Sequence, residues 1–451
     1  MHKIVMISND YKTVFQLHVA EELRSRGWPV EFVCFNRYFS SLVEGKGFNV
    51  TLVRFTKAIK NINSTPPSYS IKELVDQDPA LRGNGAGSEK YLLGVRSLVL
   101  NKYKKEKGVK TYFIGESSRG HESLISRMCE YQEINGVYLT PCTARYPSNK
   151  FFIFTKEYQL GSTSPVKCNI LPNDDFQPFS QSSPKYFQTT KDYLVKKSSW
   201  GQLIGKLYSL WVNPVYDIED VHFSKGRIKF AFSRLQHKLR SIVYNVYVKR
   251  INTAPEGDGY VLLPLQRDPE STVDVLGRYN EDQFKLVKDV SRWVPYGIKV
   301  YVKEHKTALG DRPLSFYRKI STLDNVFILN ENLPARQLIK KSDCVISVSG
   351  TVTLEALELG IPSLILSNIY ISSFPGVGVL SSELFRIPYI NHINKLQKEK
   401  NSNFLEFYKS YILHNCFDGY VGDHLTEPYV LDPENINSVA NAFESVLLNN
   451  E

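Results

Sequence analysis

The segment that most constrains this chain is a strand, a small-residue turn and a helix between residues 343 and 366. Asp343 to Val348 is a short apolar run rich in valine and isoleucine, typical of a buried parallel strand. Ser349-Gly350-Thr351 follows, and then an apolar helix that ends at Gly360, ahead of Ile361-Pro362 and a further strand. A strand, helix and strand in this order predict a βαβ unit, and therefore a parallel sheet.

The turn of this unit carries groups that suit a phosphate. Free backbone amides at the helix N-terminus, with the hydroxyls of Ser349 and Thr351, would face the C-terminal edge of the sheet. Gly350 would let the backbone approach the phosphate closely. Glu355, one turn into the helix, is placed to accept hydrogen bonds from a ribose diol. The alternative is an ordinary βαβ turn in which Ser349 only caps the helix.

A second junction precedes the first. Residues 298–302 read as a strand, and Lys303-Glu304-His305-Lys306 stands at its exit. A histidine at a strand end can donate to a phosphate, and the adjacent lysines favour an anionic ligand, whereas the alternative is a purely structural histidine. His305 precedes Asp343 by 38 positions, enough for a helix, a strand and a helix. The two junctions therefore lie side by side in a doubly wound sheet, where ligands collect at the strand C-termini.

The N-terminal part of the chain reads as another α/β domain. A strand at residues 3–8, a helix at 11–26 and a strand at 30–35 form a Rossmann-like start. Ser8-Asn9-Asp10 is not the glycine-rich dinucleotide fingerprint, which disfavours an NAD enzyme. A further strand, residues 110–114, ends in the turn from Gly115 to Gly120. Two carboxylates, Asp10 and Glu116, therefore follow predicted strands of this domain.

The chain of 451 residues suits two domains with an insertion. We expect an N-terminal Rossmann-like domain at 1–155, a helical basic insertion or linker at 156–254, a C-terminal Rossmann-like domain at 255–435 and a last helix at 436–451. Within the insertion, residues 193–212 and 225–250 have a helical pattern. Within the first domain, the glycine-rich stretch 83–87 predicts a loop at the domain edge, in a mixed region of residues 60–100.

Positive charge is concentrated in one place. The formal net charge is +10, and residues 222–250 contain eight Lys or Arg and no Asp or Glu. This segment could lie against anionic lipid or an anionic glycan; the alternative is a solvated helix whose apolar side packs on the core. No nucleic-acid motif accompanies the charge. Without an apolar run of 18 residues or a signal-peptide layout, we expect a cytoplasmic protein, peripheral on the inner face of the plasma membrane.

Four segments stand in order along the second half of the chain: QRDPEST (266–272), KEHKTALGDR (303–312), VSGTVTLEALELGIP (348–362) and FPGVG (374–378). This order resembles the capsular and surface-polysaccharide glycosyltransferases of the GT-B type, which include the Kdo transferases of capsule assembly. Those enzymes typically carry KEHP, a Ser/Gly-Thr turn and an EAL-x-x-G-x-P element. The resemblance covers residues 260–380 well and the N-terminal half loosely. Lys306 stands where the family has a proline.

The resemblance implies an α/β protein of the GT-B fold, with two Rossmann-like domains facing a cleft and a helical insertion between them. It also implies a metal-independent glycosyltransferase, without a cofactor, that moves a sugar from a nucleotide sugar onto a surface or capsular polysaccharide or a lipid-linked glycan. The histidine motif and the Ser-Thr turn resemble those of CMP-sugar users, which implies a CMP-linked ulosonic acid such as Kdo. The alternatives are a UDP-sugar transferase, a UDP-sugar epimerase and a non-catalytic polysaccharide-export factor.

In GT-B enzymes the donor sits on the second domain and the acceptor-side carboxylate comes from the first. We expect Glu116 to be the catalytic carboxylate, in a turn with Arg119 and His121 that faces the cleft, with Asp10 as the other candidate. The alternatives are that Glu116 pairs locally with Arg119 and that Asp10 caps the first helix. No D-x-D motif follows a predicted strand, so the histidine and the Ser-Thr turn would replace a metal ion. The expected donor-binding residues are His305, Lys303, Ser349, Gly350, Thr351, Glu355 and Gln266, with Glu270 less certain.

Overall fold

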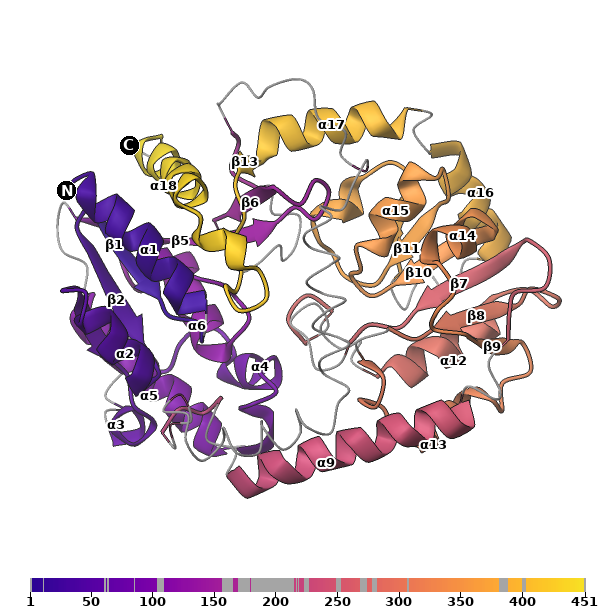
Figure 1. Ribbon diagram of the computed structural model, residues 1–451, viewed down its shortest axis with the longest axis horizontal. Coiled ribbons are helices and arrows are strands. Elements are labelled where there is room, and N and C mark those ends of the chain that lie inside the picture. The colour runs from indigo at the N-terminus through magenta and orange to yellow at the C-terminus, as the bar shows by residue number, and fades with distance from the viewer. Residues whose placement is uncertain are drawn as a thin grey trace. The chain divides into compact units, whose positions relative to one another are not determined.

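The computed structural model describes residues 2–10, 12–60, 62, 65–84, 86–103, 109–155, 165–168, 179, 215, 217, 219–222, 227–248, 253–267, 274–277, 282–305, 308–380, 388–399 and 403–449. This part of the chain divides into two units (Figure 1). Unit 1 takes its described residues from 1–159, 163–230 and 409–451, and unit 2 takes them from 231–408. The helix predicted at 193–212 lies outside the described residues.

Unit 1 contains a seven-stranded sheet in the order β13-β6-β5-β4-β1-β2-β3. Strands β1 to β5 are parallel to one another. At the edge next to β5, β6 pairs with β5 in the antiparallel sense, and β13 pairs with β6 in the same way. The first strand therefore lies between the second and the fourth, which is the Rossmann strand order. The strands are β1 His2–Ile7, β2 Val30–Cys34, β3 Asn49–Leu52, β4 Lys110–Ile114, β5 Gly136–Thr143, β6 Lys150–Phe154 and β13 Phe417–Asp418.

Helices cover both faces of this sheet. Along β1, Ile4 and Met6 pack in the core that contains α1 and α18, while Val5 and Ile7 pack in the core that contains α5 and α6. Burial on both faces explains why the strands are continuous apolar runs. The helices of unit 1 are α1 Lys12–Ser25, α2 Arg37–Glu44, α3 Phe55–Lys60, α4 Ile71–Asp76, η1 Arg82–Asn84, α5 Ala86–Lys102, α6 Gly120–Glu130, η6 Pro428–Leu431 and α18 Pro433–Leu448.

The C-terminal helix α18 belongs to unit 1, where it lies beside α1 (Figure 1). Arg26, just after α1, donates to the side chains of Asn441 and Glu444 at 2.6 and 2.9 Å. Trp28 Nε1 donates to Glu444 at 2.8 Å. These polar contacts fix the register of a helix whose apolar face already fills the core.

The loop predicted within residues 60–100 is largely helix. α5 starts at Ala86, directly after the glycine-rich stretch, and buries Tyr91, Leu92 and Val95. At Gly94 a Cβ atom would lie 1.9 Å from the carbonyl oxygen of Ala58, so α3 and α5 approach more closely than any other residue type would allow. The prediction was wrong because Gly83 and Gly87 were read as chain breakers, whereas the buried apolar side chains of α5 and its close packing on α3 at Gly94 favour a helix.

Unit 2 contains a six-stranded, wholly parallel sheet in the order β12-β11-β10-β7-β8-β9. β7 lies between β8 and β10, so the order is again that of a Rossmann fold, and the prediction of two Rossmann-like domains is confirmed. The strands are β7 Tyr260–Pro264, β8 Val300–Lys303, β9 Val326–Leu329, β10 Ser342–Ser347, β11 Ser363–Ile365 and β12 Val377–Val379.

The helices of unit 2 also cover two faces of its sheet, with Val261 and Leu263 of β7 in one core and Tyr260 and Leu262 in the other. Within the described residues, no helix combines the length and the apolar character needed to cross a membrane. The remaining helices are α9 Arg227–Val243, η2 Tyr244–Val248, α12 Gln283–Trp293, α13 Leu314–Ile320, α14 Ala335–Lys340, α15 Val352–Glu358, η4 Tyr370–Ser373, α16 Tyr389–Glu399 and α17 Phe404–Asn415, of which α9 and α17 cross the boundary between the units.

Candidate functional site

Each sheet has a switch point, the place where the strand order reverses, and the predicted site residues lie at these two places. In unit 1 the switch point lies between β1 and β4, which lead into Asp10 and Glu116. In unit 2 it lies between β7 and β10, which lead into Gln266 and Ser349, and His305 follows the neighbouring β8. Ligands of open α/β sheets bind at such points, outside the carboxyl ends of the strands.

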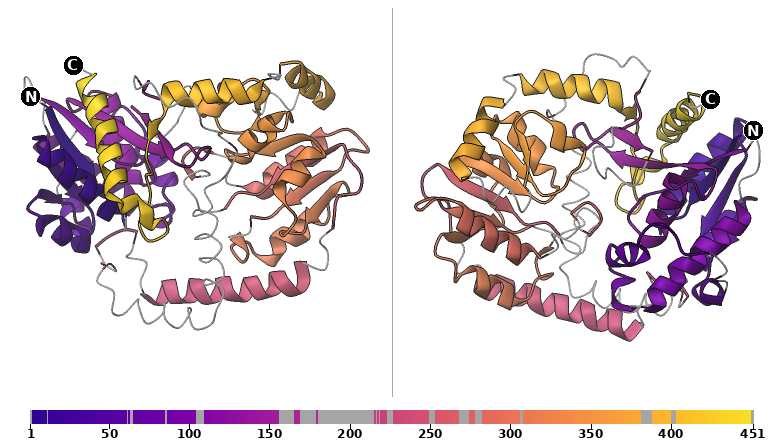
Figure 2. Two further views of the ribbon diagram at one scale, coloured as in Figure 1. Left: turned by 45° about the horizontal axis from the view of Figure 1, so that its top comes forward. Right: turned by 180° about the vertical axis from the view of Figure 1, so that it is seen from behind.

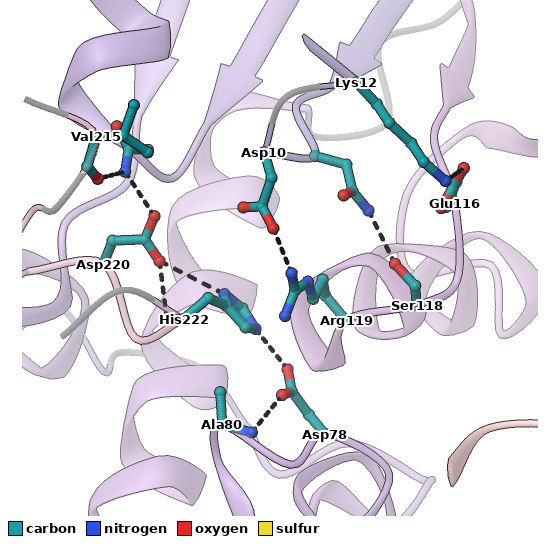
Figure 3. Close-up of polar contacts among 12 residues, drawn as sticks. Asp10, Lys12, Asp78, Ala80, Glu116, Ser118, Arg119, Val215, Asp220 and His222 are labelled. Carbon is teal, nitrogen blue, oxygen red and sulfur yellow. Dashed lines mark hydrogen bonds and ion pairs between the residues drawn. The ribbon is translucent and has the colours of Figure 1, made fainter. Parts of the chain in front are cut away.

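Two ion pairs cross the switch point of unit 1. Asp10 pairs with Arg119, and Lys12 pairs with Glu116, so each pair joins the loop after β1 to the loop after β4 (Figure 3). All four side chains are partly exposed. Glu116 thus pairs with Lys12, not locally with Arg119, and Asp10 directs its carboxylate to Arg119. The two candidate carboxylates are brought together and oriented from the opposite loop.

A buried carboxylate, Glu122, lies beneath these pairs. It accepts hydrogen bonds from Asn9 Nδ2 at 2.9 Å, and from the backbone amides of Ser118 and Arg119 at 3.0 Å each. Burial and the nearby Glu116 raise the pKa of Glu122 to about 8, although the hydrogen bonds from Asn9 and Ser118 act to lower it. Glu122 therefore ties the two loops together. Its place three residues after the helix N-cap, a capping-box position, was the signal in the sequence.

A second buried cluster joins residues 220–222 to the rest of unit 1. His222 Nε2 lies 2.8 Å from Asp78 Oδ2, and its Nδ1 lies 3.5 Å from Asp220 Oδ1 (Figure 3). Asp78 also accepts from the backbone amide of Gly120 at 2.8 Å, and Asp220 accepts from Asn36 Nδ2 at 2.8 Å.

The charges of Asp78 and His222 shift the pKa values of each other. Burial acts to lower the pKa of His222, but Asp78 and Asp220 raise it to about 9. Burial likewise acts to raise the pKa of Asp78, whereas His222 holds it well below its usual range. An imidazolium between carboxylates therefore fastens residues 220–222 to Asp78, in the loop after α4.

His121, predicted to face the cleft, is buried at the start of α6. Its ring stacks on Phe35 with 3.6 Å between centroids and meets His222 edge-on at 5.2 Å. Within the described part of the chain neither ring nitrogen has a hydrogen-bond partner. Burial and the charge of His222 lower the pKa of His121 well below its usual value, so the ring is neutral at pH 7. His121 thus packs behind the partly exposed pairs.

In unit 2, Ser347 joins the two strands of the switch point. Its Oγ accepts from Gln266 Nε2 and from the backbone amide of Gly350, each at 2.9 Å. Gln283 fixes the backbone of Gln266 through two hydrogen bonds of 2.8 and 3.0 Å. A Cβ at Gly350 would lie 2.6 Å from both Gln266 Nε2 and Ser347 Oγ, so the close approach requires glycine. The predicted residues Gln266 and Gly350 are thus brought together by a serine that the sequence did not single out.

The turn after β8 is held from below by Glu304. This buried carboxylate accepts from the His305 backbone amide at 2.8 Å and from Tyr317 at 2.7 Å, and it pairs with Arg312. Arg312 also donates to the backbone carbonyl of Gln266, which links this turn to the switch point. Glu304, Arg312 and Tyr317 were not predicted.

The side chains of the KEHK segment differ in their surroundings. Lys303 is buried and donates to the backbone carbonyl of Glu331 at 2.9 Å. His305 is exposed to solvent, and its pKa is lowered by desolvation from the surrounding chain and by the positive charges of Arg267 and Lys303. Among the described side chains of this segment, Lys303 and Glu304 are buried and His305 is open to a ligand. Lys306 and Glu270 lie outside the described residues.

The turn after β10 leads into the short helix α15. Ser349 is buried, Thr351 is exposed at the N-cap position, and Glu355 lies half-buried in the first turn. The N-cap is thus Thr351, two residues beyond Ser349, which the alternative interpretation of this turn gave as the cap. Ser349, Gly350, Thr351 and Glu355 all follow the C-terminal end of β10, at the same edge of the sheet as Gln266 and His305.

No family model matches this sequence, and no curated protein is similar to it. Solved structures resemble it weakly. A UDP-GlcNAc 2-epimerase from Neisseria meningitidis, bound to UDP-GlcNAc, is 13% identical over 92% of this chain and 100% of that chain, with a TM-score of 0.25. A glycosyltransferase from Rickettsia africae is 10% identical over 96% and 99%, with a TM-score of 0.28. KpsC of Thermosulfurimonas dismutans, a beta Kdo 2,7 transferase, is 10% identical over 64% and 73%, with a TM-score of 0.30. At these TM-scores no likeness assigns an activity or a ligand to this chain.

Proposed function

We propose that this protein is a glycosyltransferase of the GT-B type that takes its sugar from a nucleotide sugar. The observation that carries the proposal is the switch point of unit 2, where Gln266, Ser347 and Gly350 form a tight polar cradle beside the exposed His305. A glycine-containing turn at the carboxyl end of a parallel strand lets backbone amides approach a phosphate.

The donor would be held by residues that follow three neighbouring strands. His305 would donate to the phosphate of the nucleotide, and the hydroxyls of Ser349 and Thr351 would add to this, so that the leaving phosphate is stabilised without a metal ion or a cofactor. Glu355 would accept hydrogen bonds from the ribose, and Gln266 would contact the nucleotide. The donor that we propose is a CMP-linked ulosonic acid such as Kdo, because the histidine motif and the Ser-Thr turn of this chain resemble those of CMP-sugar users.

Unit 1 would supply the base. A hydroxyl of the acceptor, a surface polysaccharide or a lipid-linked glycan, gives its proton to Glu116 or Asp10 as its oxygen attacks the anomeric carbon. The bond from that carbon to the phosphate oxygen breaks, and the nucleotide leaves with the bonding electrons. We favour Glu116, and the ion pairs to Lys12 and Arg119 would keep both carboxylates oriented.

We also propose that the protein works as a peripheral protein on an anionic membrane surface, where a lipid-linked or membrane-bound acceptor would be found. The support is the segment 222–250, with eight basic and no acidic residues.

Thermal unfolding in the presence of CMP, UDP or GDP tests the donor site, because a nucleotide that binds only the folded chain stabilises it. We expect CMP to raise the melting temperature more than UDP or GDP. If UDP alone stabilises the protein, the donor is a UDP-sugar, and the protein is a transferase or an epimerase of that class. If none of the three stabilises it, the nucleotide site itself is refuted.

A further inference from the structure

The helix α9 and the turn η2 that continues it are fastened to unit 2 by one face. His237 Nε2 lies 3.1 Å from Asp311 Oδ1, and Arg240 donates to the backbone carbonyl of Asp311 at 3.1 Å. Tyr244 is buried edge-on against Tyr317 of α13, with 5.4 Å between centroids. Gly310 passes so close that a Cβ there would lie 2.6 Å from the His237 carbonyl oxygen. This inner face fixes the rotation of the helix about its axis.

The opposite face of α9 and η2 is apolar and open to solvent. Successive positions are spaced by three, four, three and four residues, and a helix turns by about 100° per residue, so they form one stripe. The stripe is about 21 Å long at about 1.5 Å per residue. We call it the outer face: Phe232, Leu235, Leu239, Ile242 and Val246, which are 68%, 43%, 53%, 42% and 55% exposed.

Single exposed apolar side chains are ordinary, but a continuous stripe of them marks an interaction surface. A rotation by half a turn separates Leu239 and Ile242 of the outer face from Ser241 and Tyr244 of the inner one. Figure 2 shows α9 as one continuous helix, with its C-terminal end near α13. The outer face is therefore presented by a helix that unit 2 already holds in place.

Charge indicates which kind of partner covers this face. The segment 222–250 carries eight Lys or Arg and no Asp or Glu, so the stripe belongs to a uniformly basic element. An apolar stripe on a basic helix is the pattern of helices that lie in the interface of an anionic bilayer. The same spacing also suits a coiled-coil seam with a second copy of the chain. Two copies would bring like charges together with no acid to compensate them, which favours the bilayer.

We propose that the outer face of α9 and η2 is the surface by which this protein docks on a bilayer that contains anionic lipid. The apolar stripe would enter the boundary between headgroups and acyl chains, and the basic side chains would meet the negative lipid. This deepens the proposed membrane location, on which it rests, and is independent of the proposed transfer reaction. Binding is therefore measured without donor or acceptor.

The test is co-sedimentation of the purified protein with phosphatidylcholine vesicles, with and without 30% phosphatidylglycerol. We expect binding to the anionic vesicles only, and weaker binding at high salt. The variant Leu235→Ser/Leu239→Ser should lose about tenfold in partitioning for each leucine, because each no longer brings apolar area into the interface. Replacing Lys225, Lys229 and Arg234 by glutamine should also lower binding.

Ile390→Ser is the matched control, since Ile390 is 54% exposed on α16 of the same unit, and it should bind like the unchanged protein. Phe232→Ser is a further single change, should the double variant fold poorly. The proposal is overturned if the unchanged protein does not bind anionic vesicles, or if the folded double variant binds them equally well. It is also overturned if light scattering shows a dimer that the double variant dissociates, because a second copy would then cover the face.

Discussion

At the scale of single residues, the switch point of unit 1 is organised by charge pairs that cross between loops. Glu116 and Asp10 each have a cation from the opposite loop, Lys12 and Arg119, and each keeps part of its surface exposed. A carboxylate in this setting is oriented by its partner and still accessible to an acceptor hydroxyl. The effect of such a carboxylate on turnover can therefore be measured separately from its effect on folding.

We predict that Glu116→Gln lowers glycosyl transfer by about 10²–10⁴-fold, because the amide cannot take up the acceptor proton. Nucleotide binding should be unchanged, since the donor residues lie in unit 2. Turnover and CMP affinity are measured on the same preparation, with Asp10→Asn tested in parallel. Glu21→Gln is the control, since Glu21 makes a comparable ion pair with Lys46 at 3.0 Å on α1. An active Glu116→Gln enzyme would remove Glu116 from the chemistry.

At Gly350 we predict that alanine weakens nucleotide binding. The added methyl group would stand 2.6 Å from Gln266 Nε2 and Ser347 Oγ, so the cradle must open, at a cost of about 1–3 kcal/mol. Calorimetric titration with CMP should show a Kd raised about tenfold or more. Gly87→Ala, where nothing lies within 4 Å of the added group, should bind as before. Equal affinity in the Gly350 variant would show that the cradle does not contact the nucleotide.

The sequence predicted residues that follow strands, and it missed those that support them. Asp10, Glu116, Gln266 and Gly350 could be found because a strand exit is visible as the end of an apolar run. Glu122 had a local signal in its capping-box position, but its bond to Asn9, 113 positions away, had none. Ser347, Glu304 and Arg312 escaped for the same reason: their contacts join separate segments, and only the folded sheet brings these together.

At the scale of elements, strands were easier to predict than the helices around them. β4 occupies the predicted residues 110–114, because burial on both faces leaves a continuous apolar run. α5 was missed, since the glycines before it looked like a loop. β6 was overlooked although its residues 151–154 are a buried apolar run, whereas β13 has only two residues, which pair with β6 across 268 positions and leave no local pattern.

The segment of residues 219–222 has no regular secondary structure, and the positive charge of His222 holds it in place through Asp78 and Asp220. The pKa of His222 is about 9 in the folded chain and 6.5 as the ordinary value, so its stabilising contribution is complete below pH 6.5 and lost as the pH rises towards 9. We predict that the difference in free energy of unfolding between the unchanged protein and His222→Gln shrinks by roughly 3 kcal/mol from pH 6 to pH 9. Urea unfolding of the full chain at each pH, followed by fluorescence, measures this difference.

Glu122, whose pKa is raised to about 8, also titrates in this range and changes the stability of both proteins. The difference between the unchanged protein and His222→Gln removes that shared contribution. His18→Gln, which removes a histidine that is 43% exposed on α1, is the control for the loss of a histidine from unit 1. A difference that stays constant from pH 6 to pH 9 would mean that His222 is not held as an imidazolium by Asp78 and Asp220.

At the scale of the whole molecule, the same strand order occurs twice, and each copy places polar groups at its switch point. The two copies differ in kind: unit 1 offers carboxylates, and unit 2 offers hydroxyls, a glycine turn and a histidine. In the transfer that we propose, the carboxylates would take up the proton of the acceptor, and the groups of unit 2 would stabilise the phosphate of the leaving nucleotide. We propose that the basic helix α9 adds a surface for a membrane.

The most direct test of this account is the calorimetric titration of CMP into the unchanged protein and into His305→Ala. His305 is exposed, so its loss should leave the melting temperature unchanged. We predict that the unchanged protein binds CMP and that the variant binds it at least about tenfold more weakly, because a donor to the phosphate is gone. Equal affinity of the two proteins, or no binding of CMP by the unchanged one, would contradict the account.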